Sequence, residues 1–195
     1  SCRAFDRFLY WCRISTIMSA YSLTVAPVGY DGQLVKVECD TVKGLPTLQV
    51  VGLATKSVDE AKERVRSAIR NSHLDFARSK VTVNLSPANL SKDGSHYDLP
   101  IAIAVLLETG QIRMQDSLSS TVFAGELGLD GGLRAIRGSI AIAETAKREG
   151  MTTLVLPAKN AAQASLVSGL EIIGVDKLSD VFLHLTGELV ITPTK

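Results

Sequence analysis

The sequence predicts an α+β fold, an α/β sandwich in which helices cover a mixed sheet. Strand patterns dominate the first third of the chain, and strands then alternate with helices toward the C-terminus. The chain has 195 residues, 46% of them hydrophobic, and this composition suits one globular domain with a single core. The sequence contains no internal repeats.

Charge and composition exclude several classes of protein. The 21 Lys and Arg residues nearly balance the 20 Asp and Glu residues, so the net charge of +1 gives no general attraction to nucleic acids or anionic membranes. The longest apolar stretch, residues 99–107, is far shorter than the roughly 20 residues of a membrane-spanning helix. Only Cys39 lies in the body of the chain, which fits a reducing compartment. We therefore expect a cytoplasmic protein without a membrane partner.

The first elements are expected to be strands joined by tight turns. A strand begins at Ser22 and ends at a turn formed by Asp31 and Gly32. The next strand, 33–40, shows the alternation of a half-buried strand. A turn containing Gly and Pro then sends the chain back as the strand 47–54, so these two strands are expected to form a hairpin.

A helix is expected to follow, from Ser57 to Asn71. Ser57 and Glu60 have the spacing of a capping box, in which the serine hydroxyl and the glutamate carboxylate bond to the first free amides of the helix. Apolar residues recur at helical intervals: Val58, Ala61, Val65, Ala68 and Ile69.

The middle of the chain predicts a strand, a loop and a buried helix. Residues 80–86 alternate as a strand does, and 87–96 has turn composition. An almost continuous apolar run then predicts a buried helix over 99–109. Pro100 suits its first turn and Gly110 its end.

The last third predicts a second hairpin and alternating strands and helices. Asp130, Gly131 and Gly132 form a turn signal between two apolar stretches. The remaining elements are expected as helices at 139–149, 159–168 and 177–186 and strands at 153–156 and 171–175.

The N-terminal segment 1–17 differs from the rest of the chain. It shows no clean periodicity, and Met18, which follows it, is the expected natural start. We interpret 1–17 as a non-native or disordered extension and 18–187 as the domain. Residues 188–195 are interpreted as a tail or the start of a linker. A targeting peptide is the alternative for the first segment, although Arg13 interrupts its apolar stretch.

The junction before the buried helix is open to a catalytic and a structural interpretation. A serine, Ser91 or Ser95, could be a nucleophile activated by Lys92 or His96, or Asp98 could act as an acid or base. Neighbouring loop residues seldom face one another correctly for such chemistry. In the structural interpretation Asp98 caps the buried helix or lies beside its N-terminus, where its carboxylate meets free amides and the positive end of the helix dipole.

Cofactor motifs do not occur in the sequence. No segment has the G-x-x-x-x-G-K-[ST] pattern of a P-loop, and His73, His96 and His184 are widely separated. Cys39 also has no partner at the spacing of metal ligands. We therefore expect this chain to hold no ATP, metal or other cofactor.

One face of the helix at 57–71 carries cations that could contact phosphates of a nucleic acid or a protein partner. The cations are Lys62, Arg64, Arg66 and Arg70. Acidic residues are interleaved with them: Asp59, Glu60 and Glu63. A solvated face with local ion pairs is the favoured interpretation.

Four motifs together resemble one family, the N-terminal domain of the ComM/YifB-type magnesium-chelatase-like AAA+ ATPases. The likeness covers about Ser22 to Gly187. The motifs are GLPTLQVVGLATKSVDEAKERVRSAIRNS, VTVNLSPANLSKDGSHYDLPIAIAVL, FAGELGLDGGLRAIRG and TLVLPAKNAAQASLV.

The resemblance implies a fold like the proteolytic domain of Lon proteases. Matching the motifs of such domains places Asp98 at the position of the nucleophilic serine and Ile140 at the position of the lysine base. An isoleucine cannot accept a proton, so the Ser-Lys dyad is absent and this chain is not expected to be an enzyme.

The resemblance also implies a role. It indicates a non-catalytic accessory domain of an AAA+ ATPase whose relatives include DNA branch-migration helicases, with ATP and Mg bound only by the AAA+ module. The expected partners are that module and neighbouring subunits, which form a homo-oligomer, a hexamer, in the full protein. DNA is a further candidate partner. Two alternatives remain: a diverged Lon-like serine peptidase using Ser95 or Asp98, and a small-ligand or anion-binding module with Lys92 and Gly94 as donors.

Overall fold

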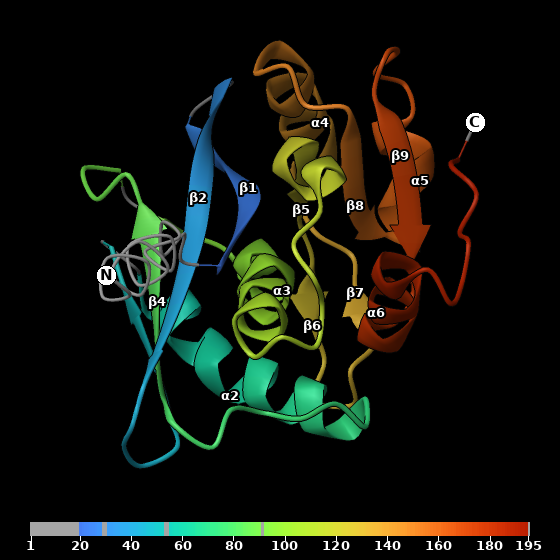
Figure 1. Cartoon of the computed structure of the whole chain (residues 1–195). Coiled ribbons are helices and arrows are strands. Elements are labelled where there is room, and N and C mark those ends of the chain that lie inside the picture. Colours follow the sequence, from blue (N-terminus) through green and yellow to red (C-terminus); the bar gives the residue numbers. More distant parts are fainter. Residues whose placement is uncertain (1–19, 29–30, 53–54, 91, 195) are drawn as a thin grey trace, which may run out of the picture.

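The computed structural model describes residues 20–28, 31–52, 55–90 and 92–194. The predicted α+β class is confirmed, because helices pack around a seven-stranded mixed sheet (Figure 1). The predicted extension 1–17 lies outside the described residues. None of the described helices combines the length and the apolar character needed to cross a bilayer.

The sheet has the strand order β3-β4-β2-β1-β5-β8-β9. The β1–β2 and β2–β4 pairs are antiparallel, and all other neighbouring pairs are parallel. The strands are β1 (Ala20–Val28), β2 (Asp31–Val42), β3 (Thr47–Val51), β4 (Lys80–Ser86), β5 (Thr121–Phe123), β8 (Thr153–Pro157) and β9 (Glu171–Val175).

Two expectations about the first strands are wrong. Asp31 and Gly32 already belong to β2, where they pair with Val28 and Pro27, so they do not form the turn. Strand β3 does not form a hairpin with β2, because β4 lies between them and pairs with both. A parallel β3–β4 pair requires a long crossover connection, and the helix between these strands supplies it.

Five α-helices and two short 3₁₀ helices surround the sheet in the described residues. The α-helices are α2 (Lys56–Asn71), α3 (Asp98–Glu108), α4 (Ser139–Arg148), α5 (Ala158–Ala164) and α6 (Leu178–Thr186). The 3₁₀ helices are η1 (Ser95–Tyr97) and η2 (Asp116–Ser120). All five predicted helices are confirmed, although α5 ends four residues before its predicted end at 168.

Two apolar clusters lie on the two faces of the sheet. Val25 and Ala26 are consecutive in β1 and point to opposite faces, so they belong to different clusters. The larger cluster contains α2 and α3, and the smaller contains α4 and α5. Helix α3 is buried along almost its whole length, as its apolar sequence predicts.

The N-cap of α2 is not at the position that the predicted capping box requires. The helix begins earlier than expected, with Thr55 as its N-cap, so Ser57 lies inside the first turn. The Thr55 hydroxyl does not cap the helix but donates to Asp93 Oδ1 at 2.9 Å. This bond ties the start of α2 to the loop before η1.

The second predicted hairpin is confirmed. Strands β6 (Glu126–Leu127) and β7 (Leu133–Arg134) are antiparallel, and the turn between them closes with a 2.8 Å bond from Gly128 N to Gly132 O. This hairpin is separate from the main sheet and lies beside α2 and the start of α3 (Figure 1). It therefore brings its backbone amides close to the predicted functional junction.

Candidate functional site

Asp98 forms a buried ion pair with an arginine of a neighbouring helix. Its side chain has no solvent-exposed surface. Arg64 Nε lies 2.7 Å from Asp98 Oδ2, and Arg64 Nη2 lies 3.0 Å from Oδ1, so the guanidinium binds both carboxylate oxygens. The amide of Leu127 also donates to Oδ2 at 3.1 Å. Three separate elements, α2, α3 and β6, therefore meet at this carboxylate.

Burial and the ion pair shift the pKa values of both Asp98 and Arg64. Loss of water raises the pKa of Asp98 to about 6, although Arg64 and the Leu127 amide act in the opposite direction. The hydrogen bonds to Asp98 raise the pKa of Arg64. Arg64 keeps 22% of its side chain exposed, so one edge of the pair can reach solvent.

Asp98 lies at the start of the buried helix α3, as predicted, but the prediction that it caps this helix is wrong. The helix is continuous with η1, and Tyr97 at the N-cap position already has helical backbone angles and makes no side-chain cap bond. The first amides are satisfied by backbone oxygens: the amide of Asp98 donates to Ser95 O, and that of Leu99 to Gly125 O at 3.0 Å. The carboxylate is therefore free to bind Arg64.

The other residues of the junction are neighbours in the sequence, but the fold does not arrange them for catalysis. Lys92 is buried and its Nζ donates to the carbonyl of Pro87, and burial lowers the pKa of Lys92. His96 is 5% exposed, and its Nε2 lies 2.9 Å from Val25 O. Within the described part of the chain, no hydrogen bond joins the Ser95 hydroxyl to Lys92 or His96. Ser91 lies outside the described residues.

A cavity of about 380 Å³ lies beside η1. It contains polar and charged side chains from the junction and from the β6–β7 hairpin, together with an apolar wall. Its lining residues are Pro27, Asp93, Gly94, Ser95, His96, Glu126, Ala135, Ile136 and Arg137. Neither Asp98 nor Lys92 lines it.

The four cations of the predicted basic face of α2 have different surroundings. Arg64 forms an ion pair with Asp98, and Lys62 forms an ion pair with Asp59. Arg66 lies over the ring of Phe76, with 5.6 Å from its guanidinium carbon to the ring centroid. Arg70 is exposed near the end of the helix. Only Arg66 and Arg70 of the four therefore have no carboxylate partner among the described residues.

Sequence reasoning missed two features of the site. The partnership of Arg64 with Asp98 joins residues 34 positions apart, and the Leu127 amide is a backbone group that no side-chain pattern marks. One signal was available, because a carboxylate beside an unbroken apolar run must be paired when it is buried. The nearest cations on a predicted amphipathic helix were the candidates for that partner.

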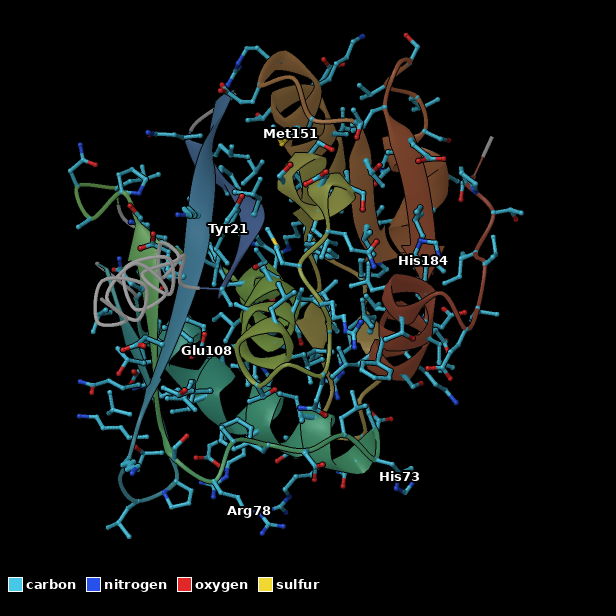
Figure 2. The ribbon with its side chains drawn as sticks, viewed as in Figure 1. Tyr21, His73, Arg78, Glu108, Met151 and His184 are labelled. Carbon is cyan, nitrogen blue, oxygen red and sulfur yellow. The ribbon has the colours of Figure 1, made fainter. Side chains whose placement is uncertain are left out.

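The residues proposed from the Lon-like pattern have different surroundings. Asp98 is bound by Arg64, whereas Ile140 lies in α4 with 41% of its surface exposed. The histidines are far apart, with His73 after α2 and His184 on α6 (Figure 2). The described residues contain no group of three His, Cys, Asp or Glu side chains placed to hold a metal ion.

Together the fold and site define an α+β domain with a buried, arginine-paired aspartate at the start of its central helix. Comparison with known families matches residues 37–160 to the model described as subunit ChlI of Mg-chelatase. The chain therefore belongs to this magnesium-chelatase-like family.

Curated relatives support the same assignment. The chain is 39% identical over 165 residues to the protein YifB of Escherichia coli, which covers 85% of this chain and 32% of YifB. It is 39% identical over 166 residues to the competence protein ComM of Haemophilus influenzae, covering 84% of this chain and 32% of ComM. An uncharacterized protein of Mycobacterium tuberculosis is also 39% identical, over 85% of this chain and 33% of that protein.

The chain spans about a third of the length of these relatives. A more distant likeness is to the Lon protease of Aster yellows witches'-broom phytoplasma, which is 28% identical over 165 residues, covering 78% of this chain and 20% of the protease.

Proposed function

We propose that this chain is the non-catalytic accessory N-terminal domain of a ComM-like AAA+ ATPase. The proposal is supported by the likeness to ComM and YifB, which covers most of this chain but only a third of theirs. On this proposal the protein is cytoplasmic, ATP and Mg bind to an AAA+ module elsewhere in the full protein, and this domain serves subunit assembly or contact with DNA or a partner protein.

The observation that carries the non-catalytic part is the engagement of Asp98. Arg64 binds both of its carboxylate oxygens, and Leu127 N donates to one of them. A nucleophile needs a free lone pair aimed at the substrate and a base that accepts its proton. Asp98 accepts three hydrogen bonds and its side chain is fully buried, so a substrate cannot reach it, and at the position implied for the base the side chain is Ile140.

The isolated chain is expected neither to hydrolyse ATP nor to cleave casein, and a fluorophosphonate probe should not label it. The probe reacts only with an activated serine, and the Ser95 hydroxyl has no bonded base within the described residues. Labelling that disappears in Ser95→Ala would instead support the alternative, a diverged serine peptidase.

The assembly role is tested on the full-length natural protein. We expect removal of residues 18–187 to leave ATP binding intact but to shift the mass distribution measured by light scattering from a hexamer toward smaller species. A hexamer of unchanged stability after this deletion would contradict the assembly role.

DNA contact is a second candidate, favoured by a half-buried cation, Arg66, and an exposed one, Arg70, in the second half of α2. Arg66 and Arg70 are not paired with carboxylates in the described structure, and the exposed side chain of Arg78 points outward below the same helix (Figure 2).

Replacing Arg66 and Arg70 together with Gln is expected to weaken binding of a single-stranded oligonucleotide and to lower the slope of log affinity against log salt by about 1.4, roughly 0.7 per phosphate contact. The matched control is Lys62→Gln, because Lys62 already pairs with Asp59. Fluorescence anisotropy at several salt concentrations measures both quantities. Equal slopes for the double variant and the control would contradict the DNA role.

A further inference from the structure

Among the described residues, no hydrogen bond is made to one ring nitrogen of the buried His96. Its Nε2 lies 2.9 Å from the carbonyl oxygen of Val25, and a carbonyl oxygen only accepts hydrogen bonds. Nε2 therefore carries the ring proton, and Nδ1 is left with an unshared lone pair. Burial also lowers the pKa of His96 to about 4, so the ring is neutral at physiological pH.

The surroundings of Nδ1 leave it open to the cavity beside η1. Gly94 lies beside it, because an added Cβ at this position would be only 2.8 Å from Nδ1. Gly94 has a φ of +111° and lines the cavity together with His96. Any other side chain at this position would cover the nitrogen, so the glycine keeps the acceptor accessible.

The rest of the cavity is rich in acceptors. Asp93 and Glu126 contribute carboxylates and Ser95 a hydroxyl, Arg137 contributes a guanidinium, and Pro27 and Ile136 form an apolar wall. Glu126 also lies 3.7 Å from Arg134 Nη1, and most of the Arg134 side chain is exposed. This arrangement argues against the anion-binding module considered from the sequence. Lys92, one of its two expected donors, is buried against Pro87 O and does not line the cavity. Two carboxylates and the Nδ1 lone pair of His96 face one cation, Arg137, among the lining residues, so acceptors outnumber cationic donors and the cavity suits a hydrogen-bond donor better than an anion.

We propose that this cavity binds a primary ammonium group carried on an alkyl chain. The ammonium group donates one hydrogen bond to His96 Nδ1 and lies near the carboxylates of Asp93 and Glu126, and the alkyl chain packs against Pro27 and Ile136. A lysine side chain of a partner segment and a free alkylamine share this chemistry. The proposal goes beyond the accessory role and does not depend on the AAA+ context.

The nitrogen itself reports on binding in a chain labelled with ¹⁵N-histidine. The Nδ1 resonance of His96 is followed in long-range proton–nitrogen spectra during titration with n-butylammonium and with Nα-acetyl-lysine methylamide. We expect both probes to shift this resonance while the nitrogens of His73 and His184 stay unchanged. A response to the lysine probe alone would identify a partner's lysine as the source, and equal responses a free amine.

Variants separate binding from folding. Glu126→Gln should weaken ammonium binding roughly tenfold, because a hydrogen bond to a charged group is lost. Gly94→Ala should abolish it by covering Nδ1, and circular dichroism checks that this strained variant is folded. His96→Gln gives a second test, and Glu149→Gln, outside the cavity, is the matched control. No shift of Nδ1 with either ammonium probe, or an equal shift with the anion pentanoate, would overturn the proposal.

Discussion

Replacing Asp98 with alanine is expected to lower the free energy of unfolding by about 3 kcal/mol. Two groups lose the Asp98 carboxylate at once: the amide of Leu127 and the guanidinium of Arg64. The effect stays below the largest values known for broken buried pairs because Arg64 is 22% exposed and can recover some hydration. Urea denaturation followed by circular dichroism measures the change.

Matched variants distinguish the ion pair from a general effect of losing charge. Asp98→Asn keeps an oxygen for the Leu127 amide and should cost less than alanine. Arg66→Ala removes a cation of the same helix that only contacts the ring of Phe76, and should cost about 1 kcal/mol or less. If Asp98→Ala were no more destabilising than Arg66→Ala, the buried pair would not contribute to stability as described.

Elements with strong periodicity could be predicted from the sequence. Buried side chains alternate with exposed or half-buried ones along β4, and α3 is apolar on almost every side, so the hydrophobic pattern alone identifies both. The turn of the β6–β7 hairpin also has a local cause, since Gly131 adopts a φ of +84° that other residues avoid. These features depend on neighbouring residues only.

Strand pairing could not be predicted in the same way. Strands β2 and β3 are joined by a short turn-like segment, which favours a hairpin, but β4 lies between them. The stable arrangement depends on where α2 can pack its apolar stripe, because the helix connects β3 to β4 and covers the sheet. The sequence of β2, β3 and their turn does not show that packing of α2 outweighs the local preference for a hairpin.

The candidate site illustrates the same limit. The sequence correctly marks Asp98 as a structurally constrained carboxylate but assigns it the wrong partner. Helix capping is a local interaction and is the natural first hypothesis, whereas the actual donors come from α2 and β6. Likewise, the sequence does not distinguish His96 from the other two histidines. Only the structure shows that its Nε2 lies against β1 and its other ring nitrogen beside Gly94.

Asp98 and His96 are expected to give the folding stability opposite dependences on pH. The folded state raises the pKa of Asp98 from its ordinary 3.8 to about 6, so the native protein binds more protons than the unfolded chain between these values. The stabilisation is present below about pH 4 and is lost as the pH rises through 6. A shift of this size corresponds to about 3 kcal/mol.

His96 acts in the other direction, because the folded state lowers its pKa from 6.5 to about 4. Its contribution is present above pH 6.5, is lost as the pH falls toward 4, and also amounts to about 3 kcal/mol. The contributions of Asp98 and His96 to the free energy of unfolding therefore nearly cancel in the wild type across pH 4 to 6.

Urea unfolding at a series of pH values should show Asp98→Asn gaining stability relative to wild type as the pH rises, and His96→Gln losing stability relative to wild type. Differences from wild type remove the contributions of other groups, such as Glu38, whose pKa is also shifted. Parallel stability curves for all three proteins would show that neither residue has the folded-state pKa that its burial implies.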